Sequence, residues 1–160
     1  MNMTRVLVFS DSHGSTRQMI SALEEQPSAR YALFLGDGAE GFSELAAAFP
    51  DVQFYAVCGN CDRVCDLPMF RLVSIAGRKI YMTHGHTEGV KYSMGTLIKQ
   101  ARIHGADIAL YGHTHISSVN YIEGLYLVNP GSVSRPRAGR AGYAVIDITE
   151  SVIVPFIREL

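Results

Sequence analysis

Short apolar runs that end in polar, glycine-containing segments recur through the first sixty residues. Arg5 to Ser10, Tyr31 to Leu35 and Val52 to Val57 are rich in β-branched and aromatic residues. Continuous apolar runs of this length, bounded by turn residues, predict buried strands.

The segments between these strands carry apolar residues at helical spacing. Ser15 or Thr16 is placed to cap a first helix, which ends near Pro27. A second helix passes through Leu45 to Phe49 and ends at Pro50. Strands that alternate with helices predict an α/β layered fold with a parallel component.

The rhythm changes after residue 68. Phe70 to Ile75 and Lys79 to Thr83 predict a hairpin, because the short turn Ala76 to Arg78 separates the two runs. Lys91 to His104 has apolar residues on one face and predicts a helix. Asp107 to Tyr111 predicts a further strand that runs into a polar loop.

The remaining chain carries short runs joined by Gly, Pro and Asn, which we interpret as an antiparallel second sheet. These runs are Ser117 to Ile122, Leu125 to Val128, Ala141 to Ile148 and Val152 to Ile157. The last run is expected either to complete that sheet or to pair across a homodimer.

Composition limits the kind of protein. The chain has 160 residues, 48% of them hydrophobic, and we expect residues 1–160 to form one compact domain. Lys and Arg total 14 against 15 for Asp and Glu, so no net positive field favours a nucleic acid. No apolar run approaches the roughly 18 residues that cross a bilayer, and charged residues precede any signal-peptide core. We therefore expect a soluble, cytoplasmic protein without a membrane or nucleic-acid partner.

The three cysteines are close together in the chain. Cys58, Cys61 and Cys65 do not frame the sequence as a disulfide scaffold would, which favours a reducing compartment. Cys58 and Cys61 form a C-x-x-C pair, which leaves a redox dithiol or half of a zinc site open. No convincing helix follows the pair and no second thiolate pair accompanies it, so we favour a core position for Cys58.

Potential metal ligands follow five of the predicted strands. The carboxyl ends of strands in an α/β sheet meet at one edge, so ligands far apart in the sequence can converge there. Five of the six histidines lie at these strand ends, and only His104 lies elsewhere. The five segments are Asp11-Ser12-His13, Gly36-Asp37-Gly38, Gly59-Asn60-Cys61-Asp62, His84-Gly85-His86 and Gly112-His113-Thr114-His115.

The donor types indicate which cations these segments would bind. Carboxylate oxygen, imidazole nitrogen and amide oxygen suit Mn²⁺, Fe²⁺ or Zn²⁺ better than Ca²⁺. In extended backbone, residues two apart point to the same side. We therefore expect Asp11 and His13 to face one cavity together, and His113 and His115 to do the same.

The order of these motifs resembles the calcineurin-like metallophosphoesterase family, specifically its small single-domain bacterial and archaeal phosphodiesterases. The family pattern is D-x-H, G-D, G-N-H-[DE], His-Gly and G-H-x-H, and the match spans residues 6 to 115. The turn Asn129-Pro130-Gly131-Ser132 beyond it is also similar to the family. Each motif alone is weak evidence, whereas five in this order are specific.

The resemblance implies a four-layer α/β/β/α sandwich of two mixed β-sheets flanked by helices. It also implies a hydroxide that bridges two divalent metals and attacks phosphorus in line, with manganese as the first choice and iron, zinc or nickel as alternatives. The implied ligands are Asp11, His13, Asp37 and His115 for the first metal, and Asp37, Asn60, His84 and His113 for the second. A small phosphate ester is the expected substrate.

Two residues bear on catalysis beyond metal binding. The amide of Asn60 can bind a metal through oxygen and reach a phosphoryl oxygen through nitrogen. Cys61 replaces the histidine of G-N-H-[DE], and a thiol is a weak, uncharged hydrogen-bond donor. We therefore expect diesters and aryl esters to be better substrates than alkyl monoesters, with His86 as a substitute donor.

Other interpretations stay open at this point. A protein-binding scaffold on the same fold would lack turnover, although buried carboxylates and imidazoles without a cation cost free energy. The loop that carries Arg135, Arg137 and Arg140 is either a solvated surface or a phosphate contact. The start of the helix at Lys91 to His104 lies near His86 in sequence and is a candidate border of the substrate site.

Overall fold

The computed structural model describes residues 2–160, in two five-stranded sheets and three helices. The helices are α1 (Arg17–Glu25), α2 (Phe42–Ala48) and α3 (Gly95–Ile103), with a short 3-10 turn η1 (Ala39–Gly41) before α2. The strands are β1 (Thr4–Phe9), β2 (Ala29–Phe34), β3 (Gln53–Ala56), β4 (Phe70–Ile75), β5 (Arg78–Thr83), β6 (Ile108–Leu110), β7 (Ser118–Ile122), β8 (Leu125–Asn129), β9 (Gly142–Ile148) and β10 (Ile153–Glu159).

Both sheets are mixed. The first has the order β10-β9-β1-β2-β3, with β1, β2 and β3 parallel and β9 antiparallel to both β1 and β10. The second has the order β4-β5-β6-β8-β7, with β5, β6 and β8 parallel and the two outer strands antiparallel. The central strands are buried on both faces, which explains their uninterrupted apolar sequences.

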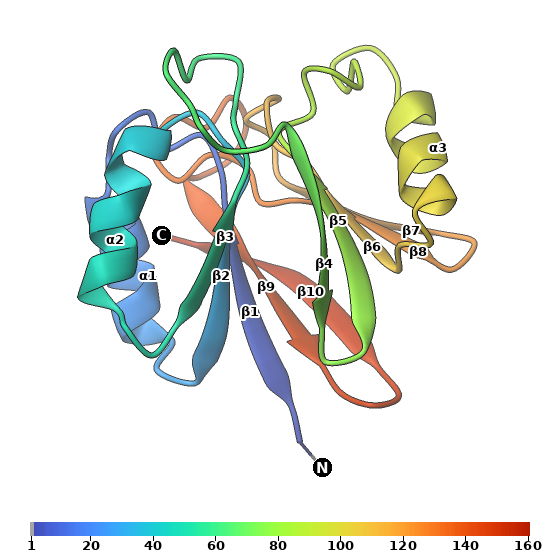
Figure 1. The fold of residues 1–160 in the computed structure, drawn as a ribbon, viewed down its shortest axis with the longest axis horizontal. Helices are drawn as coiled ribbons and strands as arrows, with labels where there is room; N and C mark the ends of the chain where they lie inside the picture. The colour runs from blue at the N-terminus through green and yellow to red at the C-terminus, as the bar shows by residue number, and fades with distance from the viewer. Residues whose placement is uncertain (1) are drawn as a thin grey trace.

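The sheets pack face to face, and helices cover their outer faces (Figure 1). Val6 and Leu33 of the first sheet pack with Met82 and Leu110 of the second in one buried cluster. A second cluster joins the outer face of the first sheet to α1 and α2, and a third joins the second sheet to α3. The predicted α/β/β/α sandwich of two mixed sheets is therefore confirmed.

The terminal strands differ from the sequence prediction of a separate antiparallel sheet. Only β7 and β8 join the second sheet, whereas β9 and β10 extend the first. The run predicted to complete the second sheet or pair across a dimer instead pairs with β9, for example Val154 with Asp147. Period and turn residues predict that strands exist, but their partners depend on which apolar faces meet.

Helix ends also differ from the prediction. The first helix lies where expected, but neither Ser15 nor Thr16 caps it, because Thr16 makes no capping hydrogen bond and the Ser15 hydroxyl bonds the Gln18 side chain. The last helix begins at Gly95 rather than Lys91, because turns occupy the segment after His84. Lys91 therefore lies in a loop and not on a helix.

The carboxyl ends of β1, β2, β3, β5 and β6 all lie at the same end of the molecule, beneath the loops at the top of Figure 1. Three of these strands belong to the first sheet and two to the second. The sequence predicted that the ligand segments would converge at the edge of one sheet. In the structure they converge where the edges of two sheets lie together. No helix within residues 2–160 has the length and apolar character to cross a bilayer.

Candidate metal centre

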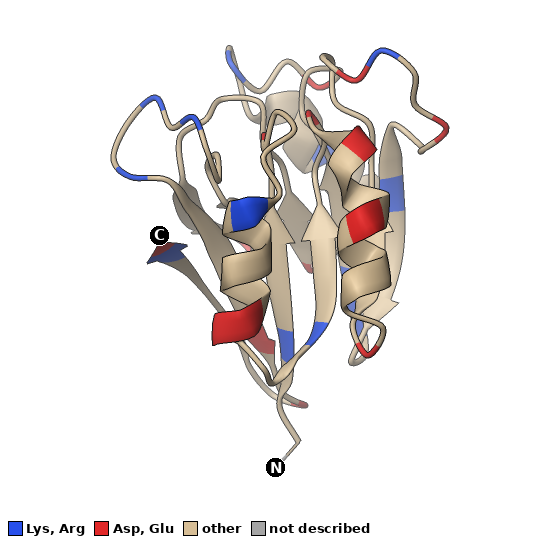
Figure 2. Cartoon of the chain, turned by 90° about the vertical axis from the view of Figure 1, so that its left-hand side faces the viewer, with Lys and Arg blue, Asp and Glu red and all other residues tan. Residues whose placement is uncertain are grey.

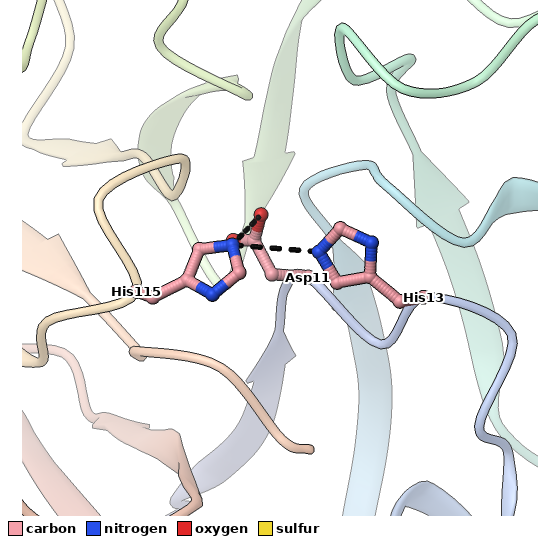
Figure 3. A group of neighbouring side chains, drawn as sticks. All are labelled: Asp11, His13 and His115. Atoms are coloured by element: carbon pink, nitrogen blue, oxygen red, sulfur yellow. Dashed lines mark hydrogen bonds and ion pairs between the residues drawn. The ribbon is translucent and has the colours of Figure 1, made fainter. Parts of the chain in front are cut away.

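Asp11, His13 and His115 form one group of potential ligands, whose donor atoms all lie within 4.8 Å of one another (Figure 3). The Nε2 atom of His115 is 3.2 Å from Asp11 Oδ1 and 3.4 Å from His13 Nε2. Asp11 and His13 follow β1, whereas His115 follows β6 in the other sheet. Residues 102 positions apart are therefore in contact only because the two sheets are packed together.

Asp37 and His84 extend this group on its inner side. The Nε2 atom of His84 is 3.3 Å from Asp37 Oδ2 and 3.8 Å from Asp11 Oδ1. Asp11, Asp37 and His84 form a second ligand group, and Asp37 forms a third with His13 and Cys61. Asp37 thus belongs to two ligand groups, one with His13 and the other with His84.

Backbone carbonyls fix the orientation of two of the imidazoles. His84 Nδ1 lies 2.7 Å from the Leu35 carbonyl oxygen, and His115 Nδ1 lies 2.6 Å from that of Arg135. An N–H donated from Nδ1 leaves Nε2 as the lone-pair atom, and Nε2 faces the ligand group in both cases. Metal-binding histidines use their second nitrogen in this way.

Some buried polar atoms of the group have no hydrogen-bond partner. Asp11 Oδ1 and His84 Nε2 are both inaccessible to water and unpaired, although the other oxygen of Asp11 accepts bonds from Ser10 Oγ and the His113 N–H. A buried acceptor without a partner costs free energy unless something binds it. A divalent cation would satisfy both atoms, so the residues present fit a metal.

The electrostatic field of the group keeps Asp37 ionised. Burial alone would raise the pKa of Asp37, but its close contact with the His84 imidazole and the hydrogen bond from the Cys61 N–H hold the pKa well below its ordinary value. Burial would likewise lower the pKa of His84, yet Asp37 and Asp11 raise it overall. Asp37 is therefore ionised, and its negative charge can bind a cation.

Asn60, His113 and His86 belong to none of the three ligand groups. Asn60 is exposed, and its Nδ2 lies 3.6 Å from Cys61 Sγ. The His113 ring lies 5.1 Å from the His84 ring, and burial with the charges of His84 and Lys91 lowers the pKa of His113 to about 4. A neutral imidazole of this kind can bind a metal.

His86 lies on the same side of the group. Its ring centroid is 5.4 Å from that of His84, and its Nδ1 is buried without a partner. Burial and the nearby His84 lower its pKa, so the ring is neutral near pH 7. A neutral imidazole still offers one N–H, which keeps the expected donor role open.

The backbone of the ligand segments corrects one prediction. Asp11, His13, His113 and His115 were expected in extended conformation, but their φ angles are 55°, 48°, 71° and 60°, and that of Asp37 is 61°. Non-glycine residues rarely adopt this left-handed region, and those that do are found in turns and cluster at functional sites. The two residues of each pair lie on the same side because left-handed backbone turns place them there. They do not do so through the alternation of side chains along an extended strand.

Asp62 organises the site without being one of the predicted ligands. Its carboxylate accepts four backbone N–H groups, from Asp37 at 2.8 Å, Gly38 at 2.9 Å, Ala39 at 3.0 Å and Gly59 at 2.8 Å. The loop after β2 and the loop after β3 are thereby joined. The sequence contained a signal, since Asp62 ends the G-N-x-D motif, but the motif does not say what its carboxylate binds.

The turn at residues 129–134 supports the loops from the opposite side. Asn129 donates from Nδ2 to Thr114 Oγ1 at 2.9 Å, within the loop that carries the last two histidines. Ser132 donates to the Asp11 carbonyl at 2.8 Å, and Ser134 donates to the Ser12 carbonyl at 2.9 Å. Hydrogen bonds from the family-like turn therefore hold the first and last ligand segments in position.

Two glycines are required by close contacts. A Cβ atom at Gly59 would overlap the Asp37 side chain, and one at Gly112 would overlap the side chains of Ser10 and Asp11. The carboxylates can approach the neighbouring loops only because these two positions lack a side chain.

The cysteines behave differently from the sequence prediction. Cys58 is buried as expected, and it forms a disulfide with Cys65. Cys61 is an exposed free thiol, so Cys58 and Cys61 are not the C-x-x-C redox pair. Desolvation and the Asp37 carboxylate raise the pKa of the Cys61 thiol, which disfavours a reactive thiolate.

Comparison with known proteins agrees with this geometry. The family model described as "Calcineurin-like phosphoesterase superfamily domain" matches residues 4–151. The chain is 34% identical to the probable metallophosphoesterase YsnB of Bacillus subtilis over 146 residues, which cover 89% of this chain and 83% of that protein. It is 27% identical to the phosphodiesterase YfcE of Escherichia coli, over 91% of this chain and 88% of that protein.

A solved structure extends the similarity to the whole fold. The crystal structure of a conserved uncharacterized protein from Streptococcus pneumoniae, described as a predicted phosphoesterase, superposes with a TM-score of 0.84. The two sequences are 26% identical, and the alignment covers 98% of this chain and 90% of the other.

Proposed function

This chain belongs to the calcineurin-like phosphoesterase superfamily, and from that premise we propose that it is a metal-dependent phosphodiesterase. The observation that carries the proposal is the convergence of Asp11, Asp37 and His84, in which the buried atoms Asp11 Oδ1 and His84 Nε2 have no hydrogen-bond partner. A scaffold protein would have no need to bury these atoms unpaired, because each costs free energy.

The chain's own residues would hold the metals in two sets. Asp11, His13 and His115 would hold one ion, His84, His113 and Asn60 would hold the other, and Asp37 would contact both. When bound, a pair of divalent ions supplies Lewis-acid stabilisation of the phosphoryl oxygens and a water of lowered pKa. Manganese remains the first choice, with iron, zinc and nickel as alternatives, because oxygen and nitrogen donors accept all of them.

Two uncharged groups, Asn60 and His86, would then act on the substrate. The Asn60 side chain is exposed at the site, so its amide nitrogen can donate to a phosphoryl oxygen. His86 remains the proposed donor to the departing oxygen, through one neutral imidazole N–H. Cys61 would contribute little, since its thiol is protonated and weakly polar. A small phosphate ester is the proposed substrate, and a cytoplasmic location and a homodimer remain predictions.

Metal dependence tests the proposal directly. We expect purified protein stripped with EDTA to lose hydrolysis of bis(4-nitrophenyl) phosphate and to regain it with Mn²⁺, measured together with bound metal by mass spectrometry. The physical reason is that the carboxylates and imidazoles alone cannot supply a nucleophile at neutral pH. Folded protein that binds Mn²⁺, Fe²⁺, Zn²⁺ and Ni²⁺ no better than a non-metalloprotein would contradict the proposal and favour the scaffold.

The replacement of the family histidine gives a second prediction. We expect Cys61→His to raise turnover of an alkyl monoester about five- to ten-fold relative to the aryl diester, because an imidazole can donate a proton to the poor alkoxide leaving group. Cys61→Ser serves as the control that removes the sulfur without adding a general acid. An unchanged ratio of monoester to diester turnover in Cys61→His would show that this position does not determine the preference.

A further inference from the structure

Two clefts open from the candidate metal centre, and they share His13, Asp37, Cys61 and Arg135. A phosphodiester carries two organic substituents on one phosphorus. If the phosphoryl group binds at the shared residues, each substituent has a cleft of its own. The two clefts have volumes of about 370 Å³ and 330 Å³, which suits small-molecule substituents rather than a polymer.

The clefts differ in charge. The smaller one, which we call the basic cleft, is lined by Lys91, Arg135 and Arg137 beside His113 and His115. Its only carboxylate is Asp37, which already belongs to the ligand groups. The larger cleft has both signs, since Glu40 and Asp62 line it with Arg63 and Arg135.

The three cations of the basic cleft lack carboxylate partners. Within residues 2–160, none of the ion pairs contains Lys91, Arg135 or Arg137. Arg140, in the same loop between β8 and β9, does form one, at 3.7 Å from Glu159. Lys and Arg positions are visible along this loop in Figure 2. These three cations without ion-pair partners create a local positive field in a chain whose net charge is −1. Such a field attracts an anionic ligand.

The backbone fixes these cations beside the site. The Arg135 carbonyl accepts the bond from His115 Nδ1, and the Arg137 N–H donates to the His115 carbonyl at 3.0 Å. The Arg135 N–H also donates to Ser132 Oγ at 2.7 Å. Lys91 lines the same cleft as His113. The loop that carries Arg135 and Arg137 therefore cannot move away from the site without breaking its hydrogen bonds to His115.

We propose that the basic cleft binds an anionic group on one substituent of the substrate, so that the preferred substrates are phosphodiesters with an additional phosphate or carboxylate. This inference rests on the proposed phosphodiesterase function. The metals would neutralise the reacting phosphoryl group, and Lys91, Arg135 and Arg137 would neutralise a second negative charge beyond it.

Three substrates with the same leaving group test the inference on metal-loaded protein. They are the 4-nitrophenyl phosphodiesters whose second substituent is ethyl, 2-carboxyethyl or 2-(phosphonooxy)ethyl. We expect kcat/KM for the two anionic substrates to exceed that of the ethyl ester about ten-fold at low salt, mainly through KM. The advantage should shrink to about two-fold at 1 M salt, where the Debye length is about 3 Å. The larger of the two anionic effects identifies the anion.

Variants assign the preference to the cleft. Arg137→Gln and Lys91→Gln should each lower the ratio of anionic to neutral kcat/KM about three-fold, with little change for the ethyl ester. Arg140→Gln is the matched control, because Arg140 lies in the same loop but does not line the cleft, and its ratio should stay unchanged.

The possible failures are distinguishable. Equal kcat/KM for all three substrates would overturn the inference while leaving the phosphodiesterase function intact. A preference that Arg140→Gln reduces as much as Arg137→Gln would also overturn it, since net charge alone would then explain the effect. If none of the three substrates is hydrolysed in a metal-dependent way, the proposed phosphodiesterase function itself is wrong, and the inference falls with it.

Discussion

Replacement of Asp37 by Asn is expected to lower phosphodiester turnover by about 10³-fold or more, because the variant removes a carboxylate that is grouped with His13 on one side and with His84 on the other. Asn has nearly the same shape, so the hydrogen bond from the Cys61 N–H to Oδ1 can persist. The charge that holds His84 is lost, and with it the field that attracts a cation.

Metal content separates this prediction from a general loss of folding. We expect bound metal per chain to fall by about half or more in Asp37→Asn, measured by mass spectrometry after dialysis, while circular dichroism stays that of the parent protein. Asp51→Asn is the control, because Asp51 is an exposed carboxylate in the turn before β3. Full metal content with full turnover in Asp37→Asn would exclude Asp37 as a bridging ligand.

Replacement of Asp62 by Ala is expected to lower turnover about 100-fold although Asp62 is not a proposed ligand. Its carboxylate accepts N–H groups from both the Asp37 loop and the Gly59 loop, so the variant leaves four backbone donors without their acceptor. We also expect the free energy of unfolding to fall by about 2–3 kcal/mol, since bonds to a charged acceptor are lost.

The two readouts for Asp62 must move together. Asp66→Ala is the matched control, because Asp66 is an exposed carboxylate in the same loop and should change neither turnover nor stability. Chemical denaturation measures the free energy of unfolding, and metal titration followed by calorimetry measures the affinity. If Asp62→Ala unfolds at lower denaturant but binds metal and turns over as before, Asp62 stabilises the fold without positioning Asp37.

The disulfide illustrates a limit of reading cysteines from spacing. The sequence places Cys61 nearer to Cys58 than Cys65, yet the structure bonds Cys58 to Cys65 and leaves Cys61 free. Cys58 lies two residues after β3, and the loop beyond it returns so that the Cys58 N–H donates to the Pro68 carbonyl at 2.9 Å. The path of that loop, and not the number of residues between the cysteines, decides the pairing.

Strand existence and donor chemistry were determined by the sequence alone. The apolar runs of β1, β2 and β4 were predicted to within about two residues, because burial of alternating or continuous apolar positions is a local property. The proposed ligands were also selected by local features, namely carboxylates and imidazoles directly after strands. The same local motifs, taken in their order along the chain, also indicate the family to which the chain belongs.

Relations between distant segments were decided only by the tertiary structure. The partners of β9 and β10, the left-handed backbone at Asp11 and His115, and the four bonds to Asp62 all join parts of the chain that the sequence does not connect. The same holds for the basic cleft, which Lys91 and Arg137 line from two different loops. A contact of this kind arises when two sheets bury their apolar faces against each other, and no local pattern specifies which loops that packing brings together.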